Sequence, residues 1–319
     1  MLSNRNGLLG EPKYRICKSP GSDGKKIVFF CDWDYIHSPK TTFLGKPVYF
    51  QQPKTANLPF HSKEIAEEIY LDLSKIRPQS LYTCDLGLKL TCENLASGLL
   101  INNSQSVLQT LCLVSMDCVV REIYSTFAKQ ELCLQNEKFK QILGTLESYL
   151  GESYELGVVG YHAVNPLCDD NELDLVIIAD TVEQLNLSRK KIDHMPNVRY
   201  STYISEIWPL SKRTTDIGSL DFFYSTRNSP SKILSNLENA RILELHFEFD
   251  STIIDDSMGI LGTPMWKTED SFYIIGIDNA LRGRLRIGDR VVGIGISAMV
   301  ENEKVVIIQS TGNISYVAH

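Results

Sequence analysis

The chain has 319 residues, of which 43% are hydrophobic and 22% charged, and its formal net charge is −7. This composition excludes a largely disordered chain, and the length suits two or three domains. No apolar run approaches the roughly 18 residues of a membrane-spanning helix, and the acidic balance disfavours broad non-specific binding to nucleic acid. The N-terminal residues contain no apolar segment of the kind found in secretion signals, so we expect a cytoplasmic protein without membrane contact.

The N-terminal part of the chain mixes strand and helix patterns. Residues 1–25 are rich in Gly, Pro, Ser and Lys, which predicts a loose lead-in. Two β-rich runs follow, near 26–32 and 46–50. The spacing of apolar residues then predicts a helix over 61–76. The apolar residues of 106–127 cover more than one helical face and predict a buried helix.

The middle of the chain has the clearest local signals. Apolar residues at helical spacing predict a helix over 136–150. A short strand over 156–160, a loop and a second strand over 172–180 follow. Thr181 is the expected N-cap of a helix over 182–192, whose basic residues lie in its last turn, where they suit the helix dipole.

The C-terminal part of the chain shows short strand patterns, with no helical periodicity between them. Apolar and polar residues alternate over 243–249, which predicts a half-buried strand. Further β-rich runs over 271–277, 290–300 and 304–310 are separated by Gly and Asp turns. Strands at this spacing predict a small antiparallel β barrel or sandwich.

These elements predict an α+β protein with a central mixed sheet and helices, an N-terminal β-rich segment and the C-terminal β domain. We divide the chain into a lead-in, an N-terminal β-rich and helical region, a central core and the β domain. Their ranges are 1–25, 26–134, 135–230 and 240–319.

Acidic residues stand at the start of two apolar strand patterns. Because alternate residues of a strand share a face, Glu172 and Asp174 are expected on one face and their apolar neighbours on the other. Adjacent carboxylates repel each other unless a cation lies between them, and hard oxygen ligands suit Mg²⁺ or Mn²⁺. Asp221 opens another apolar β-rich run and is the best candidate for a third ligand in a site for phosphoryl transfer.

This arrangement resembles the DNA polymerase β-like nucleotidyltransferase superfamily. Its signature is a helix, a strand that ends in Gly-Ser or Gly-Gly, a loop of about ten residues, and acidic–x–acidic at the start of the next strand. Gly160-Tyr161, ten intervening residues and Glu172-Leu173-Asp174 fill these places here. The resemblance implies a nucleotidyltransferase-like central sheet.

The whole chain is similar to a set of archaeal-type predicted nucleotidyltransferases of comparable length, which have no settled substrate. The similarity extends to Asp255-Asp256-Ser257, to Gly262-Thr263-Pro264-Met265-Trp266 and to Leu281-Arg282-Gly283-Arg284. It implies that the chain moves a nucleoside monophosphate from a nucleoside triphosphate to an acceptor hydroxyl.

In this reading Glu172, Asp174 and Asp221 hold Mg²⁺ or Mn²⁺, and Asp221 also helps to deprotonate the acceptor. Gly160 and its neighbouring backbone would cradle the triphosphate. Lys212 and Arg213 precede the strand of Asp221; they are either further triphosphate contacts or a solvated pair in a loop.

Two features leave an alternative open. Tyr161 replaces the small residue of the superfamily, and its ring either crowds the nucleotide pocket, fills the mouth of the cleft or stacks on a base. Arg282, Arg284 and Arg286 alternate and are expected on one strand face, where they would contact RNA or another anionic partner or simply be solvated. The alternative is therefore a degenerate transferase fold that acts as a non-catalytic module for binding nucleic acid or protein.

Overall fold

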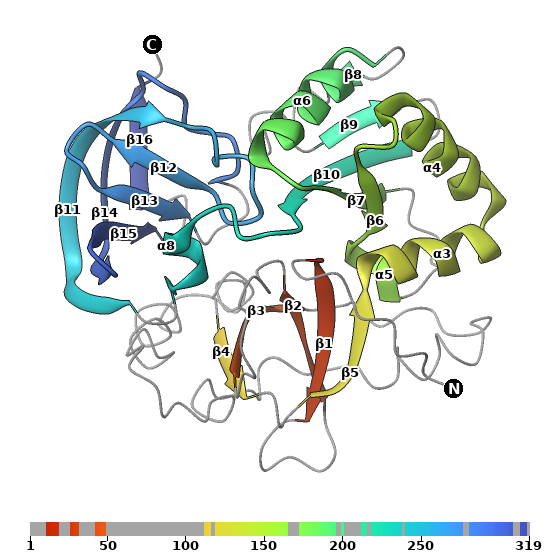
Figure 1. Ribbon diagram of the computed structural model, residues 1–319, viewed down its shortest axis with the longest axis horizontal. Coiled ribbons are helices and arrows are strands. Elements are labelled where there is room, and N and C mark those ends of the chain that lie inside the picture. The colour runs from red at the N-terminus through yellow and green to blue at the C-terminus, as the bar shows by residue number, and fades with distance from the viewer. Residues whose placement is uncertain are drawn as a thin grey trace.

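The computed structural model shows an α+β chain whose described strands form three sheets (Figure 1). In the view of Figure 1 the N-terminal sheet lies at the bottom, the central sheet at the upper right and the C-terminal strands on the left. None of the described helices is both long enough and apolar enough to cross a membrane. The structure describes residues 11–18, 26–31, 42–48, 112–115, 119–164, 172–195, 199–200, 212–215, 218–237, 240–276, 281–308 and 313–317.

The N-terminal sheet has five strands in the order β4-β3-β2-β1-β5, and every pairing is antiparallel. The alternation of charged and apolar residues in β1 places Tyr14 and Ile16 on the core side, where both are buried. The strands are β1 (Lys13–Lys18), β2 (Lys26–Cys31), β3 (Thr42–Val48), β4 (Cys112–Ser115) and β5 (Val119–Tyr124).

Two sequence predictions for this region are wrong. The expected lead-in, 1–25, contains β1, which pairs on both sides with β2 and β5. The described residues of the helix expected over 106–127 form β4, β5 and, directly after β5, the start of a helix at Ser125. A short apolar run does not separate strand from buried helix by periodicity alone, and the β-branched residues of β5 favour the strand. The helix expected over 61–76 lies outside the described residues.

The central sheet has the order β6-β7-β10-β9-β8. β7 and β10 run parallel to each other, and the other pairs are antiparallel, so the expected mixed sheet is confirmed. The strands are β6 (Glu155–Val158), β7 (Glu172–Ala179), β8 (Arg199–Tyr200), β9 (Lys212–Thr215) and β10 (Gly218–Thr226).

The helices around this sheet begin and end at local signals. The Asn136 side chain accepts a hydrogen bond from the Phe139 amide at the start of α4, and Gly151 ends that helix with φ +88°. Thr181 and Gln184 form a reciprocal capping box at the start of α6. Both expected helices and the expected cap are therefore confirmed. The helices are α3 (Ser125–Gln135), α4 (Glu137–Leu150), α5 (Gly160–Val164), α6 (Val182–Asp193) and α8 (Lys232–Ser235).

The C-terminal strands close into a barrel. The sheet order is β11-β12-β13-β15-β14-β16, and β11 also pairs with β14, which joins the first five strands in a ring. The expectation of a wholly antiparallel β domain is wrong in one pair, because β13 and β15 run parallel, whereas the other pairs are antiparallel. The strands are β11 (Arg241–Asp255), β12 (Met265–Thr268), β13 (Tyr273–Gly276), β14 (Arg290–Val300), β15 (Glu303–Ile308) and β16 (Ile314–Val317).

One continuous apolar core joins the three sheets. It contains Tyr14 and Ile16 from the N-terminal sheet, the apolar residues of β7 and β10, and Met265 and Ile275 from the barrel. A second cluster, which includes Phe249 and Trp266, belongs to the barrel alone. The barrel therefore has an interior of its own and also contributes residues to the core of the central sheet.

Candidate functional site

Asp174 of β7 and Asp221 of β10 are direct partners in neighbouring parallel strands. Such partners lie about 4.8 Å apart across the sheet and project from the same face. The opposite face carries Leu173, Leu175 and Leu220, all buried, and this alternation fixes the face of the two acids, because a one-residue slip would bury the acids in place of the leucines. Asp221 is 6% exposed and Asp174 is half-buried. The structure thus brings together two of the three predicted carboxylates.

Gly160 packs directly against Asp174. It adopts φ +67° at the start of α5, and a Cβ atom at this position would fall 1.8 Å from Asp174 Oδ2. The amide of Val159 donates to the backbone carbonyl of Asp174 at 2.9 Å, which fixes the turn to the strand. Only glycine fits both the backbone conformation and the close approach.

Tyr14 completes the glycine turn and was missed by the sequence prediction. Its hydroxyl oxygen accepts a hydrogen bond from the Gly160 amide at 2.5 Å, and its side chain is 3% exposed. The alternation of β1, with Tyr14 and Ile16 between charged residues, was the available signal. The amide expected to cradle a triphosphate is therefore engaged by a side chain from the N-terminal sheet.

Arg282 reaches the face of the sheet that carries the carboxylates. Its guanidinium carbon lies 3.8 Å from the centroid of the Phe223 ring, and its Nη1 donates to the Phe222 carbonyl at 3.4 Å. Phe223 follows Asp221 by two positions, so the two side chains share a face of β10. The C-terminal barrel thus places a buried cation beside the row of side chains that includes Asp221 and Phe223.

The prediction that Arg282, Arg284 and Arg286 share one strand face is wrong. All three lie in the irregular connection between β13 and β14, where a turn replaces the strand alternation. Arg282 is 3% exposed, whereas Arg286 is exposed to solvent. Gly283, with φ +62°, and the hydrogen bond from its amide to the Gly259 carbonyl at 2.7 Å explain why this segment turns.

The remaining predicted site residues are placed by backbone register only. Glu172 pairs with Ser219, two positions before the aspartate pair, and Lys212 of β9 pairs with Asp221. Arg213 pairs with Leu220, and Tyr161 is the second residue of α5. The side chains of these four residues lie outside the described part of the structure. Within the described residues no group of three or more His, Cys, Asp or Glu side chains is placed to hold a metal ion.

Other buried cations are explained by the fold. Lys13 and Arg15 of β1 approach Glu122 of β5, with Nζ and Nε at 3.7 and 2.7 Å from Oε1. Tyr124 donates to Glu122 Oε2 at 3.0 Å. Burial would raise the pKa of Glu122, but Lys13, Arg15 and these hydrogen bonds together lower that pKa below its ordinary value of 4.5. These residues form an internal ion-pair network, which accounts for both cations without an external anion.

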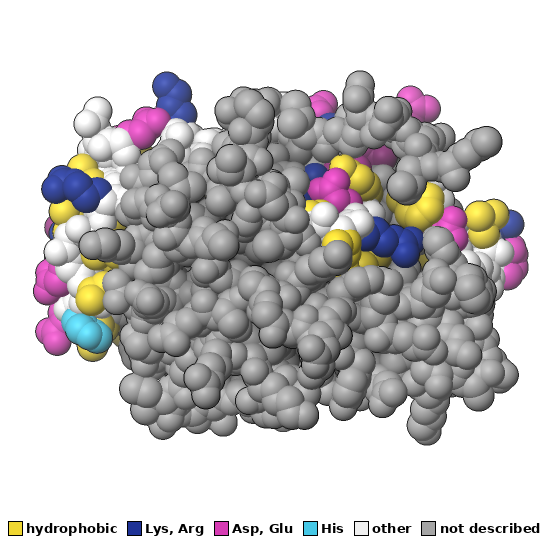
Figure 2. Space-filling view, turned by 90° about the horizontal axis from the view of Figure 1, so that it is seen from below, with side chains coloured by type: hydrophobic (Ala, Val, Ile, Leu, Met, Phe, Trp, Pro, Cys, Tyr) yellow, Lys and Arg dark blue, Asp and Glu magenta, His cyan; other side chains and the backbone are white. Residues whose placement is uncertain are grey.

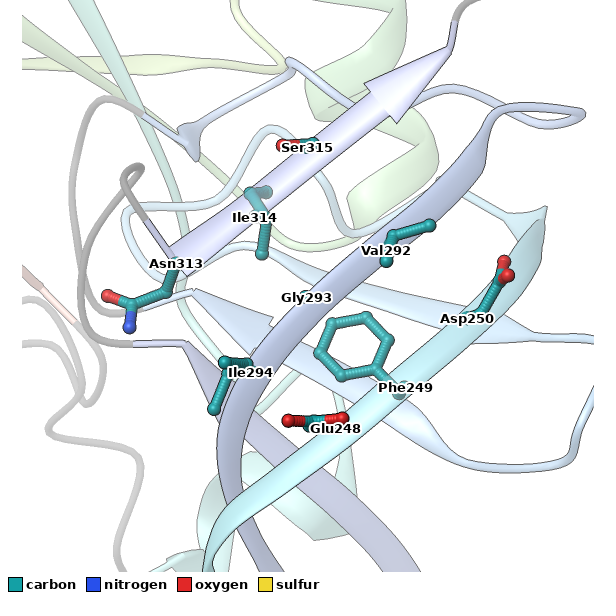
Figure 3. Close-up of a pocket in the computed structure, with 9 residues that line it drawn as sticks. All are labelled: Glu248, Phe249, Asp250, Val292, Gly293, Ile294, Asn313, Ile314 and Ser315. Atoms are coloured by element: carbon teal, nitrogen blue, oxygen red, sulfur yellow. The ribbon is translucent and has the colours of Figure 1, made fainter.

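The described surface includes a groove on the barrel and side chains of both charges. In Figure 2 the coloured Lys and Arg side chains stand beside Asp and Glu side chains. A groove of about 530 Å³ lies on the barrel, between β11, β14 and β16 (Figure 3). None of its lining residues belongs to the central sheet, so it is separate from the carboxylate pair. It is lined by Glu248, Phe249, Asp250, Val292, Gly293, Ile294, Asn313, Ile314 and Ser315.

Comparison with protein-family models, with curated proteins and with solved structures finds no match for this chain. A functional assignment therefore depends on the geometry of the described residues. The strongest feature is the cluster formed by Asp174, Asp221 and Gly160, with Arg282 on the same side of β10.

Proposed function

We propose that this chain is a metal-dependent nucleotidyltransferase that moves a nucleoside monophosphate from a nucleoside triphosphate to an acceptor hydroxyl. The observation that carries the proposal is the side-by-side register of Asp174 and Asp221 in parallel strands, with Gly160 packed against the Asp174 carboxylate. The acceptor is a hydroxyl of an RNA or of a protein.

The residues fit a divalent cation. Two adjacent carboxylates on one face repel each other, and a cation between them removes that repulsion. Hard oxygen donors favour Mg²⁺ or Mn²⁺. Asp174 and Asp221 would hold the ion, with Glu172 as a third ligand from its register position on the same strand as Asp174. When bound, the ion would stabilise the negative charge that develops on the transferred phosphoryl group.

The chain's own residues have separate tasks in this proposal. Asp221, 6% exposed, would accept the proton of the acceptor hydroxyl as that hydroxyl attacks the α-phosphorus and pyrophosphate leaves. Gly160 keeps the Asp174 carboxylate in place, because no other residue leaves room for it. Lys212, the register partner of Asp221, would neutralise charge on the triphosphate. Arg213 is the register partner of Leu220, which belongs to the opposite face of the sheet, so it has no part in this site.

The test measures binding of Mn²⁺, alone and then with each of ATP, GTP, CTP and UTP, by calorimetry and by thermal unfolding. A ligand at 100 times its dissociation constant should add about 2.7 kcal/mol to the free energy of unfolding. We expect Asp174→Asn and Asp221→Asn to abolish the gain. Asp250→Asn is the matched control, since Asp250 pairs with Arg290 on the barrel surface. Equal Mn²⁺ binding by wild type and both site variants would refute the proposal.

One observation favours a second candidate function, a non-catalytic binding module. The Gly160 amide already donates to the Tyr14 hydroxyl, so it is engaged before any polyphosphate arrives. In such a module the partner would be nucleic acid or protein, bound without a metal ion. Binding of single-stranded RNA that is unchanged by EDTA and by Asp221→Asn, together with no binding of any triphosphate, would favour this candidate.

A further inference from the structure

Arg282 is a buried cation that extends from the barrel to the carboxylate face of the central sheet. It is 3% exposed, and its guanidinium stacks 3.8 Å from the centroid of the Phe223 ring. Alternate residues along a strand lie about 6.6 Å apart, so Phe223 is the next side chain after Asp221 on that face. The guanidinium therefore lies beside the candidate site, although it comes from a different part of the chain.

The position of Arg282 is fixed by its turn. The Gly283 amide donates to the Gly259 carbonyl at 2.7 Å, and the Arg284 amide donates to the Leu281 carbonyl at 3.1 Å. Leu281 is fully buried and packs against Gly276, where an added Cβ would meet its Cδ1 at 3.0 Å. Both neighbours of Arg282 in sequence are thus anchored, which fixes its backbone, and the Phe223 ring and the Phe222 carbonyl hold its guanidinium.

Arg282 carries its charge into the interior, where its guanidinium lies against Phe223, the neighbour of Asp221 on that face of β10. Attachment of the barrel to the sheet does not depend on this cation alone, because Asn186 of α6 also donates to the Ser257 carbonyl of the barrel at 3.0 Å. Arg286, on the same turn, is exposed to solvent. The distinctive feature of Arg282 is therefore its charge at the carboxylate face.

We infer that Arg282 binds a phosphate of the polyphosphate chain of the nucleotide substrate; this inference rests on the proposed function. A triphosphate that approaches Asp174 and Asp221 meets like charge, and a fixed cation beside them offsets that repulsion. The planar guanidinium presents paired N–H donors that match the geometry of phosphate oxygens, and its stacking on Phe223 orients that plane. The barrel then supplies part of the nucleotide site, which is incomplete in the central sheet alone.

The experiment separates metal binding from phosphate binding in the full chain. Mn²⁺ alone is titrated first, and a preformed Mn²⁺–tripolyphosphate complex is titrated second. The variants are Arg282→Gln and Arg282→Lys, with Arg286→Gln as the matched control on the same turn. We expect Arg282→Gln to keep the dissociation constant for Mn²⁺ within about threefold and to weaken tripolyphosphate binding about tenfold or more. The tripolyphosphate affinity of Arg282→Lys should lie between those of wild type and Arg282→Gln, and Arg286→Gln should bind as wild type does.

The outcomes decide between the two ideas. If Arg282→Gln binds tripolyphosphate as tightly as wild type and Mn²⁺ binding still requires Asp174, the role of Arg282 is wrong and the proposed function stands. If wild type binds neither Mn²⁺ nor the complex, both are wrong. If Arg282→Gln does not fold, Arg282→Lys decides. Wild-type affinity in the folded lysine variant overturns the inference, and a loss confined to tripolyphosphate supports it.

Discussion

Gly160 and Asp174 lie so close together that residue 160 has no room for a side chain, since its Cβ would fall 1.8 Å from Asp174 Oδ2. The two residues come from different elements, α5 and β7, and the amide of Val159 ties the turn to the strand at the Asp174 carbonyl. The position of the candidate ligand and the shape of the turn are therefore set together.

Gly160→Ala should displace the Asp174 carboxylate and weaken Mn²⁺ binding at least about tenfold. The variant should also lose about 1–3 kcal/mol of stability, because its backbone requires φ +67° and its Cβ collides with Asp174. Gly144→Ala on α4 is the control, since no atom lies within 4 Å of an added Cβ there and alanine favours a helix. Calorimetry and urea unfolding measure both effects. Unchanged Mn²⁺ affinity in Gly160→Ala would show that Gly160 does not position Asp174 for metal binding.

Tyr14→Phe should leave the Gly160 amide without its acceptor and cost about 1–2 kcal/mol of stability. Under the transferase proposal the freed amide becomes available to a phosphate oxygen, so Mn²⁺–tripolyphosphate should bind more tightly than to wild type. Tyr149→Phe is the control, because Tyr149 is exposed and its hydroxyl donates to the Lys191 carbonyl at 3.2 Å. Equal tripolyphosphate affinity in Tyr14→Phe and wild type would argue against use of the Gly160 amide.

Glu122→Gln should lower stability at neutral pH by about 1–2 kcal/mol, since it removes the charge that Lys13 and Arg15 approach. The pKa of Glu122 is lower in the folded protein than in the unfolded chain. Its contribution is therefore present above the ordinary value of 4.5 and is lost as the pH falls through the folded value.

The measurement for Glu122 is urea unfolding of wild type and variant between about pH 7 and pH 3. The difference between the two should shrink on the acid side of this range. Glu147→Gln, which affects an exposed pair with Lys129, should cost under about 0.5 kcal/mol at neutral pH. A difference between wild type and Glu122→Gln that does not change with pH would contradict the lowered pKa.

Glu11→Ala should destabilise the protein by about 1–3 kcal/mol through the first turn of α3. Glu11 Oε1 accepts hydrogen bonds from the Thr126 amide at 2.8 Å and from the Thr126 hydroxyl at 2.6 Å, and Tyr124, the N-cap residue, provides no side-chain cap. Glu11→Gln keeps an acceptor and should lose less. Glu152→Ala, in an exposed turn, should change stability by less than about 0.5 kcal/mol. Equal loss from Glu11→Ala and Glu152→Ala in urea unfolding would refute the capping role.

The sequence predicted the features that depend on local patterns. Thr181 is the side-chain cap that its place before an amphipathic segment indicated. Asn136 was expected as the first residue of its helix and is instead the cap of α4. The acids of β7 and β10 stood out because each interrupts an apolar run at a strand start. Burial of the neighbouring leucines explains why both aspartates project from the opposite face, whereas their direct pairing is a register that the structure shows.

Contacts between distant segments could not be predicted in the same way. Tyr14 and Gly160 are separated by 146 positions, and Glu11 and Thr126 by 115 positions, so no periodicity links them. Arg282 was expected on an exposed strand face because alternation of arginines suggests a strand. Gly283 breaks that alternation with a positive φ, and the guanidinium is buried against Phe223 instead.

The shared core also limits how the chain can be divided experimentally. Met265, Ile275 and Ile296 of the barrel are buried in the same cluster as the residues of β7 and β10. A fragment that ends near residue 230 would expose the apolar patch these side chains cover, and an isolated barrel would expose the side chains themselves. Both pieces would tend to aggregate on expression, and we expect the intact chain to melt in a single cooperative transition instead of one for each sheet.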